Sequence, residues 1–161
     1  DLPSWYSLYR ETTSRNHIHY DDYQFFDTLW EAQNKDPETK LELLLAEKDN
    51  EPLAGMILSI NNGRATYLYG ASSSKKRHLM GTYSLQWEAM LTARKNDCDT
   101  YDMFGVSPSA DPTHPMYGLY RFKKGFGGRL FHRQGCWDYI FNERQYQLFR
   151  TEEQQMTGYH N

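Results

Sequence analysis

Apolar side chains recur at every third or fourth position in the first part of the chain. The spacing is present within residues 5–9 and again within residues 23–30. Because this is the period of a helix with one buried face, the pattern predicts two N-terminal helices joined near residues 15–20. Asp21 or Asp22 stands directly before the second group, where an aspartate is a favourable N-cap.

Two shorter apolar runs, at residues 41–47 and 53–60, predict β-strands. The polar residues between them and Pro52 indicate a turn, so we expect the two strands to form a hairpin. A second turn at residues 61–63 leads into a third antiparallel strand at residues 65–69.

The strongest helical pattern in the chain covers residues 79–95. Its apolar stripe consists of four residues: Tyr83, Trp87, Met90 and Leu91. We expect Trp87 to pack this helix onto the sheet, with Gln86 and Glu88 beside it more exposed to solvent. A short strand at residues 100–106 follows the helix.

The next segment, residues 107–115, contains prolines and aspartates and is expected to be a loop. A helix then begins at Pro115, a residue favoured in the first turn, and ends at Gly125, a residue favoured just after a helix.

The last part of the chain predicts a closing hairpin and one more helix. Residues 129–133 and 137–141 are expected to pair through a turn at Gln134 and Gly135, and residues 142–149 to form the helix. The order of elements predicts an α+β fold with one mixed, mostly antiparallel sheet flanked by helices.

The composition fits one domain that buries its own core, at 161 residues and a net charge of −3. Any cationic site must therefore arise from local clustering. Such a cluster exists, because residues 112–137 contain no acid and five cations: Arg121, Lys123, Lys124, Arg129 and Arg133. Cys98 and Cys136 lie far apart, which excludes a disulfide framework and predicts two buried, reduced thiols.

The segment 117–128 combines aromatic rings, cations and glycines, and this combination indicates ligand binding. Consecutive residues of a helix point about 100° apart, so Lys123 and Lys124 are not expected to make the same contact. Lys123 shares its stripe with Met116 and Leu119 and is expected to point inward. The alternative is two solvated lysines that interact with the C-terminal end of the helix dipole.

The loop at residues 71–77 is small and basic, and it stands directly before the central helix. Arg77, with Lys75 and Lys76, is positioned to clamp a phosphate, and Tyr83 on the next turns to stack or hydrogen-bond there. The alternatives are a solvated basic loop and a tyrosine that belongs to the core.

Other candidates have weaker patterns. Asp102 on the short strand is a possible proton acceptor or a carboxylate that caps a loop. Tyr117 and Tyr120 line a cleft or pack in the interior. The serines at residues 72–74 lack a nucleophile elbow, which favours a role in capping or in the loop. The spacing of His17 and nearby acids does not predict a metal site.

The predicted order of elements resembles the GNAT acetyltransferase fold. In that fold the loop before the central helix usually carries glycines whose backbone amides hold the pyrophosphate of coenzyme A. Here residues 71–77 read Ala-Ser-Ser-Ser-Lys-Lys-Arg, without these glycines. We therefore expect no coenzyme A.

Four blocks in matching order resemble the Fem aminoacyltransferases, which lengthen the peptide side chains of peptidoglycan precursors with aminoacyl-tRNA. The blocks lie at residues 68–73, at residues 85–88, at Cys98 with residues 101–103, and at residues 117–128. Members of that family consist of two acetyltransferase-like halves. The resemblance implies that residues 1–161 form one such domain, the C-terminal half of a longer enzyme, and the missing initiator methionine agrees with this.

The resemblance implies that an amine of the precursor attacks the ester carbonyl of aminoacyl-tRNA. Such a reaction needs a proton acceptor, an oxyanion stabiliser and a phosphate grip. The catalytic candidates are Asp102 as acceptor and Lys123 or Lys124 for the tRNA phosphate or the oxyanion. The substrate-binding candidates are Ser72, Ser73, Arg77, Tyr83, Tyr117, Tyr120 and Arg121.

The expected partners are aminoacyl-tRNA as co-substrate, a lipid-linked or nucleotide-linked muropeptide precursor, and the missing N-terminal half. We expect no metal and no other cofactor. The sequence has no run of about 20 apolar residues and no secretion signal, which predicts a cytoplasmic protein, at the inner face of the membrane when the acceptor is lipid-linked. Two alternatives remain open, namely a non-catalytic acetyltransferase-like binding module and an acyl-CoA N-acyltransferase.

Overall fold

The computed structural model describes residues 1–135 and 137–155. The chain forms two compact units, residues 1–104 and residues 105–161, and each is described by itself. The first unit contains a four-stranded sheet with helices on both faces, and the second contains two helices and their connections.

The sheet of the first unit is mixed, as the order of elements predicted. Strand β1 (Thr39–Lys48) pairs antiparallel with β2 (Glu51–Asn61), and β2 pairs antiparallel with β3 (Arg64–Ser72). The predicted hairpin and third strand are confirmed. A short fourth strand, β4 (Thr100–Asp102), lies parallel to β3 at the edge.

Strand β4 is shorter than predicted, ending at Asp102 instead of residue 106. Two residues further on, the backbone of Phe104 has a positive φ of 64°, which an extended strand does not adopt. The carboxylate of Asp102 accepts a hydrogen bond from the Phe104 amide at 2.8 Å, so the aspartate closes a turn there.

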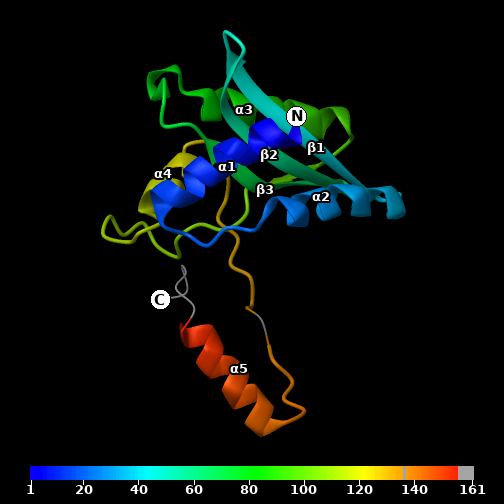
Figure 1. The fold of residues 1–161 in the computed structure, drawn as a ribbon, viewed down its shortest axis with the longest axis vertical. Coiled ribbons are helices and arrows are strands. Elements are labelled where there is room, and N and C mark those ends of the chain that lie inside the picture. Colours follow the sequence, from blue (N-terminus) through cyan, green and yellow to red (C-terminus); the bar gives the residue numbers. More distant parts are fainter. Residues whose placement is uncertain (136, 156–161) are drawn as a thin grey trace. The chain divides into compact units, whose positions relative to one another are not determined.

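Helices α1 (Leu2–Asn16) and α2 (Tyr23–Ala32) cover one face of the sheet, and α3 (Gly81–Lys95) covers the other (Figure 1). Both N-terminal helices and their connection are confirmed. Asp22 caps α2 by accepting from the Phe25 amide at 2.9 Å. Two short 3-10 turns, η1 (Gln33–Lys35) and η2 (Arg77–Leu79), follow α2 and precede α3.

The face under α1 and α2 combines a group of aromatic rings with leucines and other aliphatic side chains. The rings of Trp5 and Phe26, both fully buried, meet edge to face at 4.8 Å. Gly55 on β2 allows this close approach, because a Cβ at its position would lie 2.7 Å from Cδ1 of Trp5. The helix therefore lies against the sheet at a point where only a hydrogen fits.

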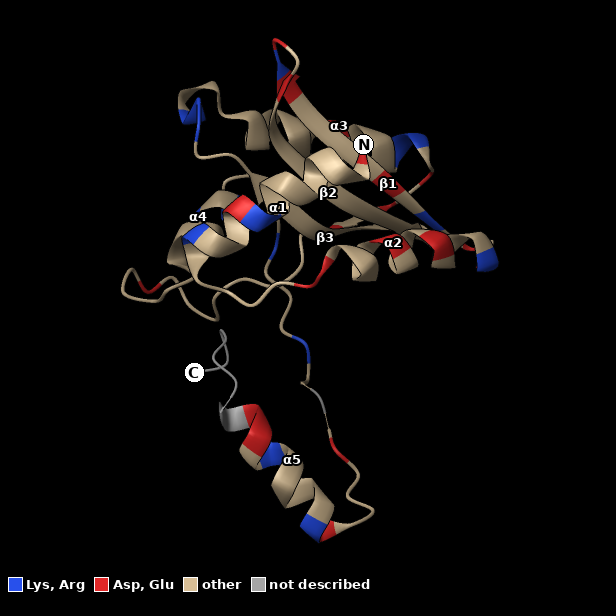
Figure 2. Ribbon diagram, in the orientation of Figure 1, with Lys and Arg blue, Asp and Glu red and all other residues tan. Residues whose placement is uncertain are grey.

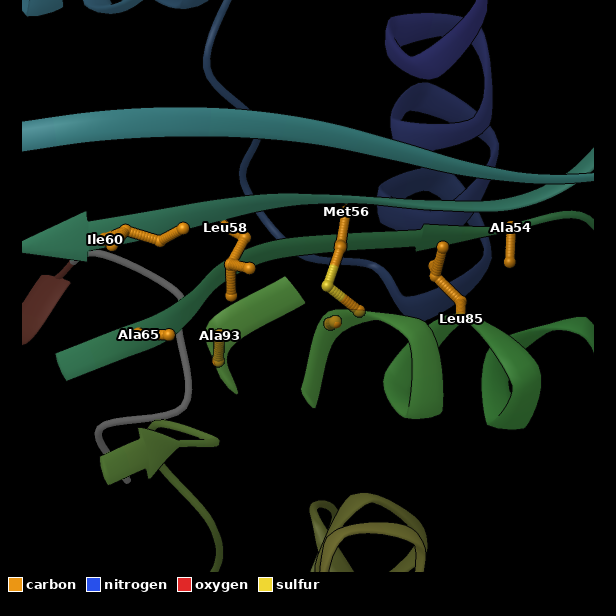
Figure 3. Packing of buried hydrophobic residues seen from close by; sticks show 8 residues of the cluster. Ala54, Met56, Leu58, Ile60, Ala65, Leu85 and Ala93 are labelled. Carbon is orange, nitrogen blue, oxygen red and sulfur yellow. The ribbon is translucent and has the colours of Figure 1, made fainter. Parts of the chain in front are cut away.

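The opposite face packs against α3, with Met56 and Leu58 of β2 meeting Leu85 and Ala93 of the helix (Figure 3). The predicted face of this helix was wrong. Gln86 is only 1% exposed and Trp87 is 62% exposed, the reverse of the expectation. The residues that contact the sheet are shifted by two positions from the predicted stripe, and they include alanines small enough to bring the helix close.

The second unit contains α4 (Tyr117–Lys124) and α5 (Glu143–Gln155). Helix α4 begins two residues after the predicted start and ends, as expected, before Gly125. The predicted closing hairpin was wrong for the residues that the structure describes, since neither 129–135 nor 137–141 forms a strand. A lone two-stranded hairpin is marginal in water, and no third strand pairs with these residues in the described part of their unit.

The two cysteines have different outcomes. Cys98 is a free, half-buried thiol, and burial raises its pKa above the ordinary value, which favours the uncharged form. Cys136 lies outside the described residues, so the prediction for it is not tested.

Candidate functional site

The end of β3 and the loop after it are held by α1. Thr12 exchanges two hydrogen bonds with the backbone of Ser72, accepting from its amide at 2.8 Å and donating to its carbonyl at 3.0 Å. Arg15 donates to the same carbonyl at 3.0 Å and to the Ser72 hydroxyl at 3.1 Å. Ser72 is therefore fixed by two side chains of α1 on both its backbone and its hydroxyl.

Ser73 is buried and serves the loop. Its amide donates to the Leu53 carbonyl at 2.9 Å, and its hydroxyl accepts from the Lys75 amide at 3.1 Å. These contacts match the loop role that the serine run indicated. Substrate binding by Ser72 or Ser73 stays a prediction.

Ser74 contacts a carboxylate from α1. Its amide donates to Oε1 of Glu11 at 2.6 Å, and its hydroxyl accepts from Arg15 at 2.9 Å. The Ser74 amide is the main reason that the pKa of Glu11 is lowered, and the hydroxyls of Ser74 and Ser73 lower it further. Sequence reasoning missed Glu11, Thr12 and Arg15, and no local signal could have found contacts across about sixty positions.

Two of the three cations expected to clamp a phosphate form ion pairs with one acid. Lys76 lies 2.7 Å from Glu51 and Lys75 lies 3.6 Å from it. The hydrogen bond from Lys76 lowers the pKa of Glu51, and the same bond raises the pKa of Lys76. Arg77, at the start of η2, is exposed, as is Tyr83 on the first turn of α3.

Asp102 lies at the other end of β3 from the loop. It stands opposite Thr66 in the β3–β4 register, six positions before Ser72, which corresponds to about 20 Å along a strand. Its carboxylate forms an ion pair with Arg64 at 3.2 Å besides capping Phe104. The structure thus shows the capping role and does not bring Asp102 together with the serines; its role as proton acceptor stays a prediction.

The two lysines of α4 point in different directions, as the helical spacing predicted. Lys123 is only 8% exposed and donates to the Gly105 carbonyl at 2.8 Å. Lys124 is exposed and donates to the Gly128 carbonyl at 3.2 Å. The inward direction expected for Lys123 is confirmed.

The other candidates on α4 are two tyrosines and an arginine. The rings of Tyr117 and Tyr120 are half-buried and stack at 6.3 Å with an interplanar angle of 12°. Arg121 is exposed, and α4 carries basic positions without an acidic one (Figure 2). The helix therefore joins one buried ammonium group, exposed cations and paired rings within eight residues.

The described residues show neither a metal site nor a membrane-spanning helix. Among residues 1–135 and 137–155, no group of three or more His, Cys, Asp and Glu side chains is arranged to hold a metal ion. None of the helices in the described ranges has the length and apolarity needed to cross a membrane.

Comparison with known proteins places these residues in context. The model of the FemAB family matches residues 31–154. Lipid II:glycine glycyltransferase from Staphylococcus aureus is 35% identical over 129 residues, which cover 78% of this chain and 30% of that protein. The chain thus spans less than a third of the length of the curated relative.

Solved structures agree in fold. The crystal structure of FemX matches with a TM-score of 0.74 and 22% identity, covering 91% of this chain and 52% of that one. An aminoglycoside 6'-N-acetyltransferase from Acinetobacter haemolyticus matches with a TM-score of 0.58 and 14% identity, covering 88% of this chain and 93% of the other. The GNAT-like acetyltransferase fold is therefore confirmed, and the family match with the identity to the glycyltransferase shows that the chain belongs to the FemAB family.

Proposed function

We propose that this chain is the C-terminal half of an aminoacyltransferase that transfers an amino acid from aminoacyl-tRNA to an amine on the stem peptide of a peptidoglycan precursor. The observation that carries the proposal is the 35% identity to a lipid II:glycine glycyltransferase over 78% of the chain. The 52% coverage of the FemX chain supports a second half outside this sequence.

Lys123 is the residue to which we assign the main electrostatic role. An ammonium group that is buried interacts with a developing negative charge more strongly than one in water, because solvent screens it less. The Gly105 carbonyl holds Nζ of Lys123 at 2.8 Å and restricts its position before substrate arrives. In this proposal Lys123 stabilises the oxyanion or holds the tRNA phosphate near the ester.

The exposed residues of α4 have a second role in the proposal. Arg121 and Lys124 face solvent and contribute charge to the RNA backbone, while Tyr117 and Tyr120 offer ring faces to a base or a sugar. Binding through a few cations works by counterion release, so affinity falls as salt increases.

The acceptor side of the proposal uses the first unit. Arg77 and Tyr83 bind the phosphate-bearing part of the precursor, and Asp102 is the candidate proton acceptor. The partners are aminoacyl-tRNA, a lipid-linked or nucleotide-linked muropeptide, and the N-terminal half. The proposed location is the cytoplasm, at the inner face of the membrane for a lipid-linked acceptor.

A non-catalytic binding module is the second candidate. It is favoured by the structural contacts that engage the proposed catalytic groups, namely Asp102 with Arg64 and Lys123 with Gly105. An acyl-CoA N-acyltransferase has the support of the acetyltransferase fold alone.

The test is transfer of a labelled amino acid from aminoacyl-tRNA to the precursor, by the complete product of the gene that encodes this chain. We expect Lys123→Ala to slow transfer at least tenfold, about 1.4 kcal/mol of barrier, with little loss of thermal stability. Lys124→Ala is the matched control, because it removes the same charge one position away and is expected to have a smaller effect.

The outcomes separate the candidates. Transfer that Lys123→Ala slows at least tenfold, and that Lys124→Ala slows less, supports the transferase and the assignment of Lys123. No transfer with any aminoacyl-tRNA, together with tRNA binding that salt does not weaken, counts against the proposal and favours the binding module.

A further inference from the structure

A backbone amide and a guanidinium of the first unit lie beside one carboxylate, that of Glu11. Oε1 of Glu11 accepts from the Ser74 amide at 2.6 Å. The guanidinium of Arg15 lies 3.9 Å away and donates to the Ser74 hydroxyl. A backbone amide and a guanidinium beside one anionic group form a donor set with which proteins also hold phosphate.

The loop around this carboxylate is fixed and positively charged. Thr12 hydrogen-bonds both the amide and the carbonyl of Ser72, and Arg15 hydrogen-bonds the carbonyl. The donors therefore keep their place without help from Glu11. Lys75 and Lys76 follow directly, and they share the single carboxylate of Glu51. If Glu11 were removed, the donor set would face solvent next to a loop with excess positive charge.

We propose that Glu11 is a resident anion that occupies a phosphate-binding loop and thereby excludes phosphoryl ligands from it. The carboxylate satisfies the Ser74 amide, and its negative charge repels a second anion. Glu11 is therefore a residue that determines which acyl donor this half accepts. It closes the loop before the central helix to the pyrophosphate of coenzyme A.

This inference deepens the proposed function, because it names the donor class that this half rejects and so leaves the site to an acyl donor of another kind. It rests on the contacts of Glu11 and is tested by anion binding alone. A failed binding test would leave the transfer assay untouched, and a failed transfer assay would leave the binding test untouched.

The experiment is titration of the 161-residue chain with inorganic pyrophosphate, followed by the amide NMR signals of residues 73–76. We expect saturable shifts for Glu11→Ala and no saturation of the natural chain over the same concentrations, so that its affinity is at least tenfold lower, which corresponds to about 1.4 kcal/mol. Glu11→Gln keeps an oxygen acceptor for the Ser74 amide without the charge, and its affinity is expected to lie between the two.

Glu51→Ala is the matched control, since it removes one negative charge from the same loop and leaves the Ser74 amide bound to Glu11. Weaker pyrophosphate binding by Glu51→Ala than by Glu11→Ala supports the proposal. Equal binding by both variants overturns it, because charge alone would then explain the effect. Unchanged signals in Glu11→Ala also overturn it, provided that the β2 amides show that the variant is folded.

Discussion

At the scale of single residues, Gln86 is a polar side chain that is almost completely buried. It is 1% exposed on α3, and its Oε1 accepts from the Tyr101 hydroxyl at 2.6 Å. Burial raises the pKa of the neighbouring Tyr67, and the Gln86 side chain partly offsets this rise. The Gln86 amide thus satisfies the Tyr101 hydroxyl, whose ring is partly buried against the core.

Replacing Gln86 with leucine is therefore expected to destabilise the chain. The leucine fills a similar volume but leaves the Tyr101 hydroxyl without the amide oxygen that accepts from it, at a cost of about 1–3 kcal/mol. Urea unfolding followed by circular dichroism measures the change. The exposed neighbour provides the control, since Glu88→Leu is expected to change stability by less than about 0.5 kcal/mol; equal effects at both positions would contradict this account.

Tyr67 and Tyr101, both partly buried against the core, predict how stability changes at high pH. Burial raises the pKa of Tyr67 from 10.0 to about 12 and raises the pKa of Tyr101 as well. Between pH 10 and pH 12, the Tyr67 hydroxyl has lost its proton in the unfolded chain but keeps it in the folded chain. The free energy of unfolding is therefore at its full value below pH 10 and falls as the pH increases toward 12. Urea midpoints across this window measure the slope.

The slope can be assigned to one residue by substitution. Tyr67→Phe removes a titrating group and is expected to flatten the decline, by at most about 1.4 kcal/mol per pH unit. Tyr20→Phe, at an exposed position, is expected to leave the slope unchanged. A decline that is the same in both variants would mean that other groups control stability in this range.

At the scale of elements, the sequence located α3 but not its buried face. Two stripes with the same spacing run along this helix, one with Tyr83, Trp87 and Leu91 and one with Leu85, Ala89 and Ala93. The first is more apolar, and the second faces the sheet. The helical period alone cannot show which stripe is buried. Where the helix lies close to the sheet only small side chains fit, and that distance is a property of the folded structure.

This choice of face predicts opposite effects for two substitutions. Trp87→Ala removes a large side chain that is 62% exposed and is expected to change the free energy of unfolding by less than about 1 kcal/mol. Ala89→Leu inserts volume where the helix meets β2 and is expected to cost about 1–3 kcal/mol. Thermal unfolding of the two variants decides the matter, and a larger loss for Trp87→Ala would indicate that the helix packs by its other face.

The elements that were predicted correctly have signals within their own sequence. The wrong predictions concern features that depend on residues far away in the sequence. The strands β1 to β3 follow from apolar runs with turns between them, and the cap at Asp22 follows from its position. The hairpin at residues 129–141 has equally good local signals but lacks a neighbouring strand in the described part of its unit. Likewise, the contacts of Glu11 with the loop span 63 positions and have no sequence pattern.

At the scale of the whole molecule, the buried hydrophobic residues are distributed unequally. Those that the structure describes all belong to residues 1–104, whereas among the described residues of the second unit only Ser107 and Lys123 are buried. The second unit instead exposes large apolar side chains. Those with more than half of their surface exposed are Phe131, Trp137, Tyr139, Phe141, Leu148 and Phe149.

Local stability is expected to follow this distribution. Segments with little buried apolar surface open with small free energies, so the amides of α5 should exchange hydrogen much faster than those of the central strand β2. Hydrogen exchange followed by mass spectrometry measures both in one sample. Similar protection of α5 and β2 would show that the apolar side chains of the second unit are covered within this chain.

The same measurement tests whether the chain is half of a longer enzyme. A protein–protein or interdomain contact that buries exposed aromatic side chains protects the backbone that carries them. In a longer product that also contains the proposed N-terminal half, we expect α5 and residues 137–141 to exchange more slowly than in the 161-residue chain, while β2 is unchanged. If the exchange of α5 is identical in the two proteins, the first half does not cover these side chains, and their burial must depend on the substrates or on another partner.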